Sequence, residues 1–350
     1  MNEPYFKGRG SQFKPANRFL QTRYVTAHPE GLDEVLQQTP DTQVFEEQAR
    51  TIINKVTSPD LGMVYSLNPY QGCEHGCVYC YARNTHEYYG FSAGLDFESK
   101  IIVKKNAPQL LEKQLMSPSW QVAPISLSGN TDCYQPLERT QQLTRAVLKI
   151  LARYQHPVSI ITKNSLILRD VDILSDLAMH QLVHVYISIT TLDETLRGKM
   201  EPRTATASKR LEVIRALSEK RIPTGVMCAP MIPGLNDHEL PHLLKAASES
   251  GALGAGLQVV RLNGAIGKIF EDWLRKNFPD RFNKVWNQIC ELHEGGVNDT
   301  QFGRRLRGSG AHAESLHQLF RAARKKYFAG REFPAYNLTR FQRGGNLTLF

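Results

Sequence analysis

The sequence predicts an α/β protein: a partial (β/α)6 TIM-type barrel with a polar N-terminal arm and a basic helical C-terminal extension. Three observations support this. Six apolar runs of strand length alternate with helical patterns, the first sixty residues lack that alternation, and basic residues accumulate near the end of the chain. Such alternation implies parallel strands joined by right-handed crossovers. Six units are too few for an eight-stranded barrel, and we expect the chemistry at the carboxyl ends of the strands.

The predicted strands span 63–67, 124–128, 158–162, 183–190, 224–229 and 255–262. Apolar stripes of helical period separate them, as at Leu143, Val147, Leu148 and Leu151. We therefore divide the chain into an N-terminal arm at 1–60, a core domain at 61–262 and the extension at 263–350. Within the arm we expect one short helix, near 45–53.

Composition indicates the cellular compartment in which the protein is expected. The chain has 350 residues, of which 41% are hydrophobic, and charges interrupt every apolar stretch, so no membrane span is expected. The N-terminus lacks the apolar core of a signal peptide, which predicts a cytoplasmic protein. In that reducing compartment, clustered cysteines indicate metal binding or catalysis more often than disulfides.

The charge is concentrated near the C-terminus. The net charge is +9, and the residues from Arg261 onward include 16 basic and 8 acidic ones. This asymmetry favours a polyanionic partner, for which we expect nucleic acid, DNA or RNA; a solvated basic face without a partner is the alternative. Arg304, Arg305 and Arg307 lie in a glycine-flanked loop suited to phosphate oxygens, and are our nucleic-acid candidates.

The most informative stretch is a cysteine cluster directly after the first predicted strand. Cys73, Cys77 and Cys80 have the spacing C-x3-C-x2-C, and Gly72 and Gly76 permit a tight loop. Thiolates this close in sequence can surround one compact metal centre, and three of them leave one iron of a cubane cluster open. The alternative is a structural zinc site, with His75 or His86 as a fourth ligand.

This motif, with Tyr79 directly before the last cysteine, resembles that of the radical S-adenosylmethionine (radical SAM) superfamily. The wider run from Asn68 to Arg83, continuing through 94–98, resembles its spore photoproduct lyase-like branch, whose members are often labelled DNA repair photolyases by similarity. The resemblance implies a 4Fe-4S cluster on Cys73, Cys77 and Cys80, with S-adenosyl-L-methionine chelated at the open iron. An electron from the cluster would yield a 5′-deoxyadenosyl radical that abstracts hydrogen from the substrate.

The resemblance also suggests which side chains surround the cofactor. The family's glycine pair and acid for the methionyl amine are replaced here by a polar run, from which Asn130, Thr131 or Asp132 must substitute. Lys163 resembles the family's lysine for the cofactor carboxylate, and Arg203 is a second candidate for it. The set of cofactor-binding candidates is Tyr79, Asn130, Thr131, Asp132, Lys163, Ser188 (for ribose hydroxyls) and Arg203.

Cys133, just past the second predicted strand, is a candidate catalytic hydrogen donor. Spore photoproduct lyases carry such a cysteine at a position that here falls near Gly129, so simple packing of Cys133 is the alternative.

The C-terminal peptide Asn-Leu-Thr-Leu-Phe is similar to the short peptides by which bacterial repair proteins dock on the sliding clamp. Leu347, Leu349 and Phe350 are the clamp-binding candidates, and a tail that folds back on its own domain is the alternative. An electron donor such as flavodoxin or ferredoxin is the other expected partner.

Together these observations predict a radical SAM enzyme that acts on nucleic acid, in DNA lesion repair or base modification. One alternative is a radical SAM enzyme acting on a peptide or a small metabolite. The other is a non-enzymatic, zinc-stabilised nucleic-acid-binding protein. Salt-sensitive retention of DNA or RNA separates the first two, and metal analysis separates the third.

Overall fold

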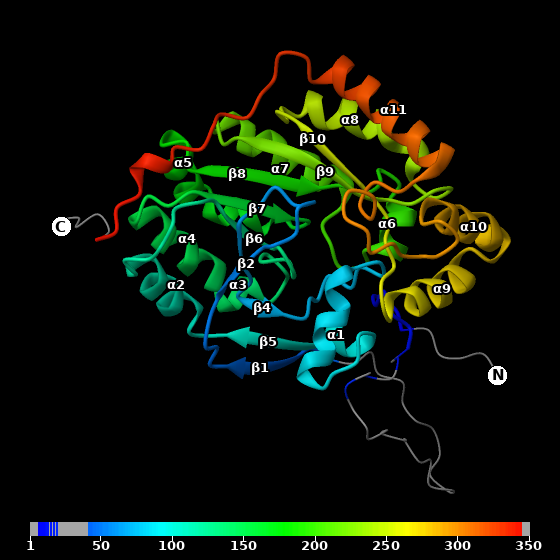
Figure 1. The fold of residues 1–350 in the computed structure, drawn as a ribbon, viewed down its shortest axis with the longest axis horizontal. Coiled ribbons are helices and arrows are strands. Elements are labelled where there is room, and N and C mark those ends of the chain that lie inside the picture. The colour runs from blue at the N-terminus through cyan, green and yellow to red at the C-terminus, as the bar shows by residue number, and fades with distance from the viewer. Residues whose placement is uncertain (1–5, 14, 16, 18, 20–40, 345–350) are drawn as a thin grey trace, which may run out of the picture.

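A seven-stranded sheet forms the partial barrel in the computed structural model, which describes residues 6–13, 15, 17, 19 and 41–344. Its strand order is β10-β9-β8-β7-β6-β3-β2 (Figure 1). The strands are β2 (Ile53–Lys55), β3 (Tyr65–Leu67), β6 (Ile125–Leu127), β7 (Val158–Thr162), β8 (Val183–Ser188), β9 (Thr224–Met231) and β10 (Ala255–Val259). The six predicted strands are confirmed as β3 and β6–β10, which all run parallel to one another. At the edge of this sheet, β2 pairs antiparallel with β3.

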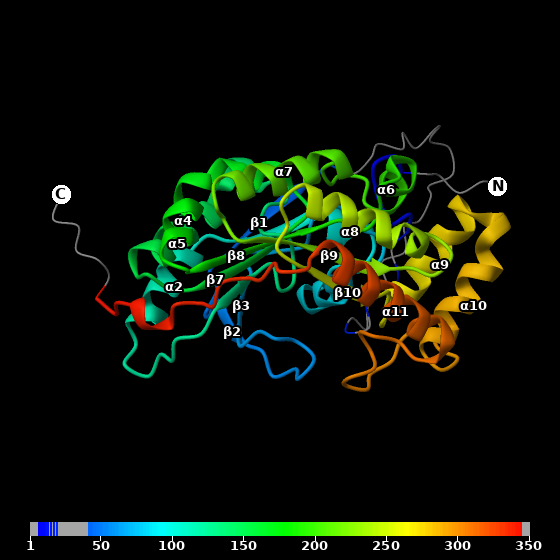
Figure 2. The same cartoon turned by 90° about the horizontal axis from the view of Figure 1, so that it is seen from above.

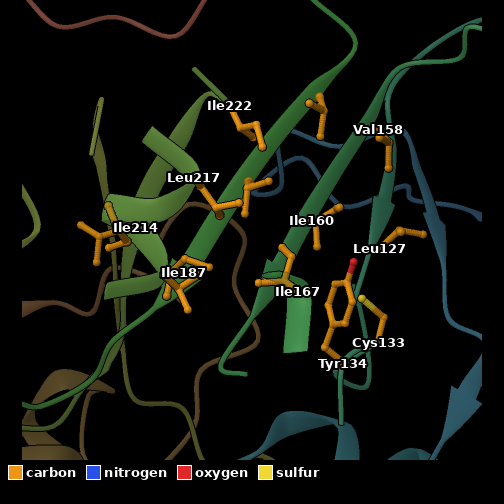
Figure 3. Packing of buried hydrophobic residues seen from close by; sticks show 14 of the residues in the cluster. Leu127, Cys133, Tyr134, Val158, Ile160, Ile167, Ile187, Ile214, Leu217 and Ile222 are labelled. Carbon is orange, nitrogen blue, oxygen red and sulfur yellow. The ribbon is translucent and has the colours of Figure 1, made fainter. Parts of the chain in front are cut away.

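Helices follow the strands, and five of those described pack on the outer face of this sheet: α2 (Ala107–Met116), α4 (Leu143–Arg153), α5 (Val171–Met179), α7 (Ala207–Glu219) and α8 (Leu240–Glu249). Two shorter helices, α3 (Glu138–Gln141) and α6 (Glu194–Met200), lie in the connections, and α6 packs with the C-terminal helices. Alternate residues of β8, such as Val185 and Ile187, share a buried apolar cluster with Ile214 and Leu217 of α7. Figure 3 shows this packing. The polar and apolar alternation therefore assigns one face of each strand to the helices and the other to the barrel interior.

The prediction of a short helix near 45–53 is wrong. The segment instead contains β1 (Gln43–Glu47) and β2. β1 lies parallel to β5 (Lys100–Lys104), which also pairs with β4 (Tyr70–Gln71), and these three strands form a second small sheet. The partner of β1, β5, is distant in sequence, and the partner of β2, β3, follows a loop. Local hydrophobic periodicity therefore gives little indication that these two segments are strands. β2 belongs to the barrel sheet, although we placed it in the N-terminal arm.

The basic C-terminal extension is helical, as expected. It contains α9 (Ile266–Asn277), α10 (Phe282–Leu292) and α11 (Gly310–Tyr327), and α11 packs on α8. Residues 328–343, which we call the C-terminal strap, then run along the sheet on the side away from α4, α5 and α7 (Figure 2).

The strap fills the barrel interior from one end. Its Phe333 and Tyr336 stack on Tyr186 and His184 of β8, and the ring of His184 also hydrogen-bonds to the Pro334 carbonyl at 2.9 Å. A glycine at 225 makes room for this contact, because a Cβ there would lie 2.8 Å from the Phe333 ring. The strap therefore closes the amino-terminal end of the barrel interior and leaves the carboxyl-terminal end open.

Among the described residues, no helix is long and apolar enough to cross a membrane.

Candidate active site

A cavity of about 280 Å³ lies at the carboxyl ends of the barrel strands. It collects most of the side chains that the sequence singled out. Its lining includes Cys73, Cys77, Tyr79, Cys80, Asn130, Thr131, Asp132, Lys163, Ser188 and Arg305. Residues from β7, β8 and β9 also line this cavity. The fold therefore brings together Cys73 and Ser188, which are more than a hundred residues apart in the sequence. This is the end of a parallel barrel at which we expected the chemistry.

The three cysteines lie on the loop between β4 and a 3-10 helix, η1 (Tyr81–Tyr89). Gly72 and Gly76 have φ values of 81° and 67°, the left-handed region that favours glycine. A Cβ on Gly76 would also stand 2.8 Å from Glu98 Oε2. The three thiols are free, and burial raises the pKa of each of them. In the part of the chain described here, no three His, Cys, Asp or Glu side chains are arranged to hold a metal ion.

The N-terminal segment 6–13 holds the outer side of the cysteine loop. The backbone amides of Gly10 and Ser11 donate to the Glu98 carboxylate at 3.0 and 2.7 Å. Arg83, fully buried, donates to the same carboxylate at 2.5 Å and to the Cys77 carbonyl at 2.9 Å. A buried charged pair of this kind is stable only when its remaining hydrogen-bonding capacity is satisfied, and the N-terminal segment supplies that here.

A second buried ion pair fixes the inner wall. Glu201 and Arg210 are 0% and 1% exposed and lie 2.6 Å apart. Tyr79 donates its hydroxyl to Glu201, and Arg210 donates to the Ser188 carbonyl at 2.8 Å. Burial alone would raise the pKa of Glu201, but the charges of Arg210 and Lys163 outweigh it and hold the pKa at about 2. The pair thus connects the aromatic residue of the cysteine motif to the end of β8.

Asp132 has little capacity left for a ligand. Its carboxylate accepts hydrogen bonds from Thr162 Oγ1 and the Lys163 amide, both at 2.8 Å, and lies 3.3 Å from His75 Nδ1. Burial acts to raise the pKa of Asp132, but His75 and the amide donors outweigh this effect, and the net pKa is lowered to about 2. Asp132 therefore organises the ends of two strands.

Asn130 and Thr131 reach the cavity from the same loop. Asn130 Nδ2 donates to Gln71 Oε1 at 3.0 Å, and Thr131 Oγ1 donates to the Tyr70 carbonyl at 2.7 Å. Thr131 is buried and Asn130 half-buried. The amide oxygen of Asn130 accepts no bond from the described residues, so this side chain keeps an acceptor for an ammonium group.

Lys163 occupies the end of β7, beside the cysteine loop. Burial lowers the pKa of its ammonium group, but Cys77 and Glu201 raise it more, so that the net pKa is raised. The side chain is half-buried and faces the cavity. It is a charged donor well suited to a carboxylate.

Cys133 lies elsewhere than we expected. It is fully buried among apolar residues, next to Tyr134 and close to Leu127 (Figure 3), and it does not line the cavity. Its carbonyl accepts a bond from Thr144 at 2.6 Å. This placement favours the packing alternative and does not support a role as hydrogen donor.

Three of the predicted arginines are also outside the cavity lining. Arg203 lies 3.4 Å from Glu74, and Arg304 pairs with both Asp299 and Glu294. Arg307 is exposed. Arg305 faces the cavity but is paired with Asp60 at 2.5 Å. The clamp-binding candidates Leu347, Leu349 and Phe350 lie outside the described residues.

The sequence reasoning missed the charged residues behind the cavity wall. One signal was available: Arg210 falls on the apolar stripe of its helix, with Val213, Ile214 and Leu217. An arginine on a buried stripe requires a buried acid, and Glu201 is the acid. For Glu98 and Arg83 the chain offers no comparable pattern, since they meet through a loop and a five-residue helix, α1 (Leu95–Ser99).

Comparisons with known proteins agree with this geometry. A sequence model of the radical SAM superfamily matches residues 67–247. An uncharacterized protein of Mycobacterium tuberculosis is 34% identical over 67% of this chain and 70% of its own length. One of Methanocaldococcus jannaschii is 27% identical over 71% of this chain and 88% of its own.

Among solved structures, spore photoproduct lyase complexed with dinucleoside spore photoproduct is similar, with a TM-score of 0.59 and 16% identity over 82% of this chain and 80% of that one. A mutant of the lyase with bound AdoMet and the same dinucleoside gives the same values. At this identity the likeness concerns the fold.

Proposed function

The chain belongs to the radical SAM superfamily and is an enzyme of that class, and from this premise we propose that it acts on nucleic acid, in DNA lesion repair or base modification. We propose that Cys73, Cys77 and Cys80 bind a 4Fe-4S cluster and that the cavity beside them binds S-adenosylmethionine. The observation that carries the proposal is that all three thiols and a lysine line one cavity at the strand ends.

The donor set fits the cluster. The thiolates of a cubane each bind a different iron, so they need not meet at one point as the ligands of a single zinc ion do. The cluster, when bound, supplies the electron that cleaves S-adenosylmethionine to methionine and a 5′-deoxyadenosyl radical. With three protein ligands, one position remains for the amino and carboxylate groups of the cofactor.

The protein residues position the cofactor and exclude water. We assign the cofactor carboxylate to Lys163, the amine to Asn130 and the ribose hydroxyls to Ser188, since these side chains face the same cavity. Tyr79, held by the buried Glu201, forms its wall. Leu61, Met63 and Leu306 supply apolar surface to the lining, which restricts water and competing hydrogen donors. Cys133 has no place in this set.

Two observations support nucleic acid as the substrate class. The similar lyase structure holds a dinucleoside photoproduct. In this chain, arginines from the basic extension and from the end of β10 line the cavity beside Tyr81. Cationic and aromatic side chains in one site are typical of nucleic-acid binding. The reductant, for which flavodoxin or ferredoxin is expected, and the sliding clamp both stay predictions.

The test is formation of 5′-deoxyadenosine by protein reconstituted anaerobically with iron and sulfide, then given dithionite and S-adenosylmethionine. We expect wild type to form the nucleoside and Cys77→Ala to form none above background, because the variant lacks one cluster ligand. Adding lesion-bearing DNA should raise the rate with the wild-type protein.

A peptide or metabolite substrate is the conclusion if DNA and RNA both leave the rate unchanged. Absence of the nucleoside in wild type, together with zinc in the purified protein, would overturn the radical mechanism.

A further inference from the structure

The mouth of the cavity carries two arginines and one carboxylate. Arg261 follows β10, Arg305 lies in the loop between α10 and α11, and both line the cavity. Asp60, in the loop between β2 and β3, accepts from Arg305 Nε at 2.5 Å and from the Gly303 amide at 2.5 Å. Ser58 Oγ accepts from Arg305 Nη2 at 2.5 Å. Asp60 therefore neutralises Arg305 and holds it in place.

Arg261 differs from Arg305 in its contacts. Its guanidinium makes no hydrogen bond or ion pair with the residues that the structure describes, although it is half-buried. Burial lowers the pKa of Arg261, and the neighbouring charge of Arg305 lowers it further. A guanidinium carries five donors in a planar fork, and leaving them without acceptors in a partly desolvated site is unfavourable. An anion at this position would remove that cost.

The surroundings of Arg261 indicate which anion. Tyr81 lines the same cavity, its hydroxyl is fixed to the Gly129 carbonyl at 2.6 Å, and its side chain remains 51% exposed. A fixed, exposed aromatic ring beside the Arg261 guanidinium provides a stacking surface for a base next to a contact for its phosphate. A free inorganic anion needs only the second of these.

We propose that Arg261, supported by the Asp60-anchored Arg305, binds one phosphodiester group of a nucleic-acid substrate at the mouth of the cavity. The inference rests on the proposed function and adds a residue that determines the substrate class. It also assigns different roles to the arginines of the basic region: Arg304 stabilises its loop through Asp299 and Glu294, whereas Arg261 contacts the substrate.

The test compares the thymidine dinucleotide TpT, which has one phosphodiester, with its uncharged methylphosphonate analogue. Binding of each to the anaerobically reconstituted protein is measured by calorimetry. A hydrogen-bonded charged contact predicts that wild type binds TpT about ten- to a hundredfold more tightly than the analogue. Arg261→Gln should bind both equally, and Arg261→Lys should discriminate weakly, because it keeps the charge but not the fork.

Arg275→Gln is the matched control, since Arg275 is an exposed arginine on α9 paired with Glu271. It should discriminate like wild type. Equal affinity of wild type for both ligands would overturn this inference while leaving a nucleic-acid substrate possible, and binding of neither ligand would overturn both. Undiminished discrimination by Arg261→Gln would also refute the assignment. If that variant fails to fold, discrimination by Arg261→Lys equal to wild type does the same.

Discussion

Glu201→Gln is expected to lower the free energy of unfolding by about 3–5 kcal/mol, because it leaves the buried guanidinium of Arg210 without its counter-charge. The side chains of the pair are 0% and 1% exposed, so water cannot compensate for the lost charge. The same change weakens the hydrogen bond that holds Tyr79 against the cavity. Urea denaturation of the purified protein measures the loss.

Glu212→Gln is the control for this prediction. Glu212 also pairs with a basic residue, Lys209 at 2.7 Å, but both side chains are at least half exposed. Exposed pairs contribute at most about 1 kcal/mol, so this variant should unfold close to wild type. Equal losses in the two variants would show that the Glu201–Arg210 pair does not stabilise the site as described.

Gly10→Ala is expected to detach the N-terminal segment 6–13 from the cysteine loop. A Cβ at this position would lie 1.7 Å from the Gly76 carbonyl oxygen, and that oxygen belongs to backbone that cannot swing aside. The segment would lose its two amide bonds to Glu98, each worth about 1.5–3 kcal/mol to a charged acceptor. Arg9, which is buried, should then become open to trypsin, with cleavage about a hundredfold faster.

The matched control is Gly62→Ala, because a Cβ on Gly62 meets nothing within 4 Å. Its cleavage at Arg9 should match wild type. If Gly10→Ala is cleaved no faster than the control, the N-terminal segment does not brace the cysteine loop.

The barrel could be predicted because each of its strands is recognisable from a short stretch of sequence. Each strand from β6 to β10 is a short apolar run bounded by a helix with its own apolar stripe, and the alternation implies the parallel order. The cysteine loop was predictable for the same reason, since its three cysteines lie within eight residues of one another. Placement at the strand ends then follows from the topology.

The remaining features depend on contacts between distant segments. β1 pairs with β5, Glu98 meets Gly10, and Arg305 meets Asp60 across more than two hundred residues. The sequence does not distinguish the arginines of the basic region from one another. The fold pairs Arg304 and Arg305 with acids, whereas Arg261 has no acidic partner among the described residues. Cys133 is the opposite case. Its position after a strand predicted a place at the active-site rim, but its side chain is buried in the hydrophobic core.

The most direct test of the central claim is iron and sulfide content after anaerobic reconstitution, with electron paramagnetic resonance of the dithionite-reduced protein. We expect about four iron and four sulfide per chain in wild type, and a spectrum that changes when S-adenosylmethionine is added. Cys73→Ala, Cys77→Ala and Cys80→Ala should each lose the cluster signal, whereas Cys290→Ala, on α10 and outside the cavity lining, should keep it. A cluster retained in all three variants, or a stoichiometric zinc ion in wild type, would contradict the assignment.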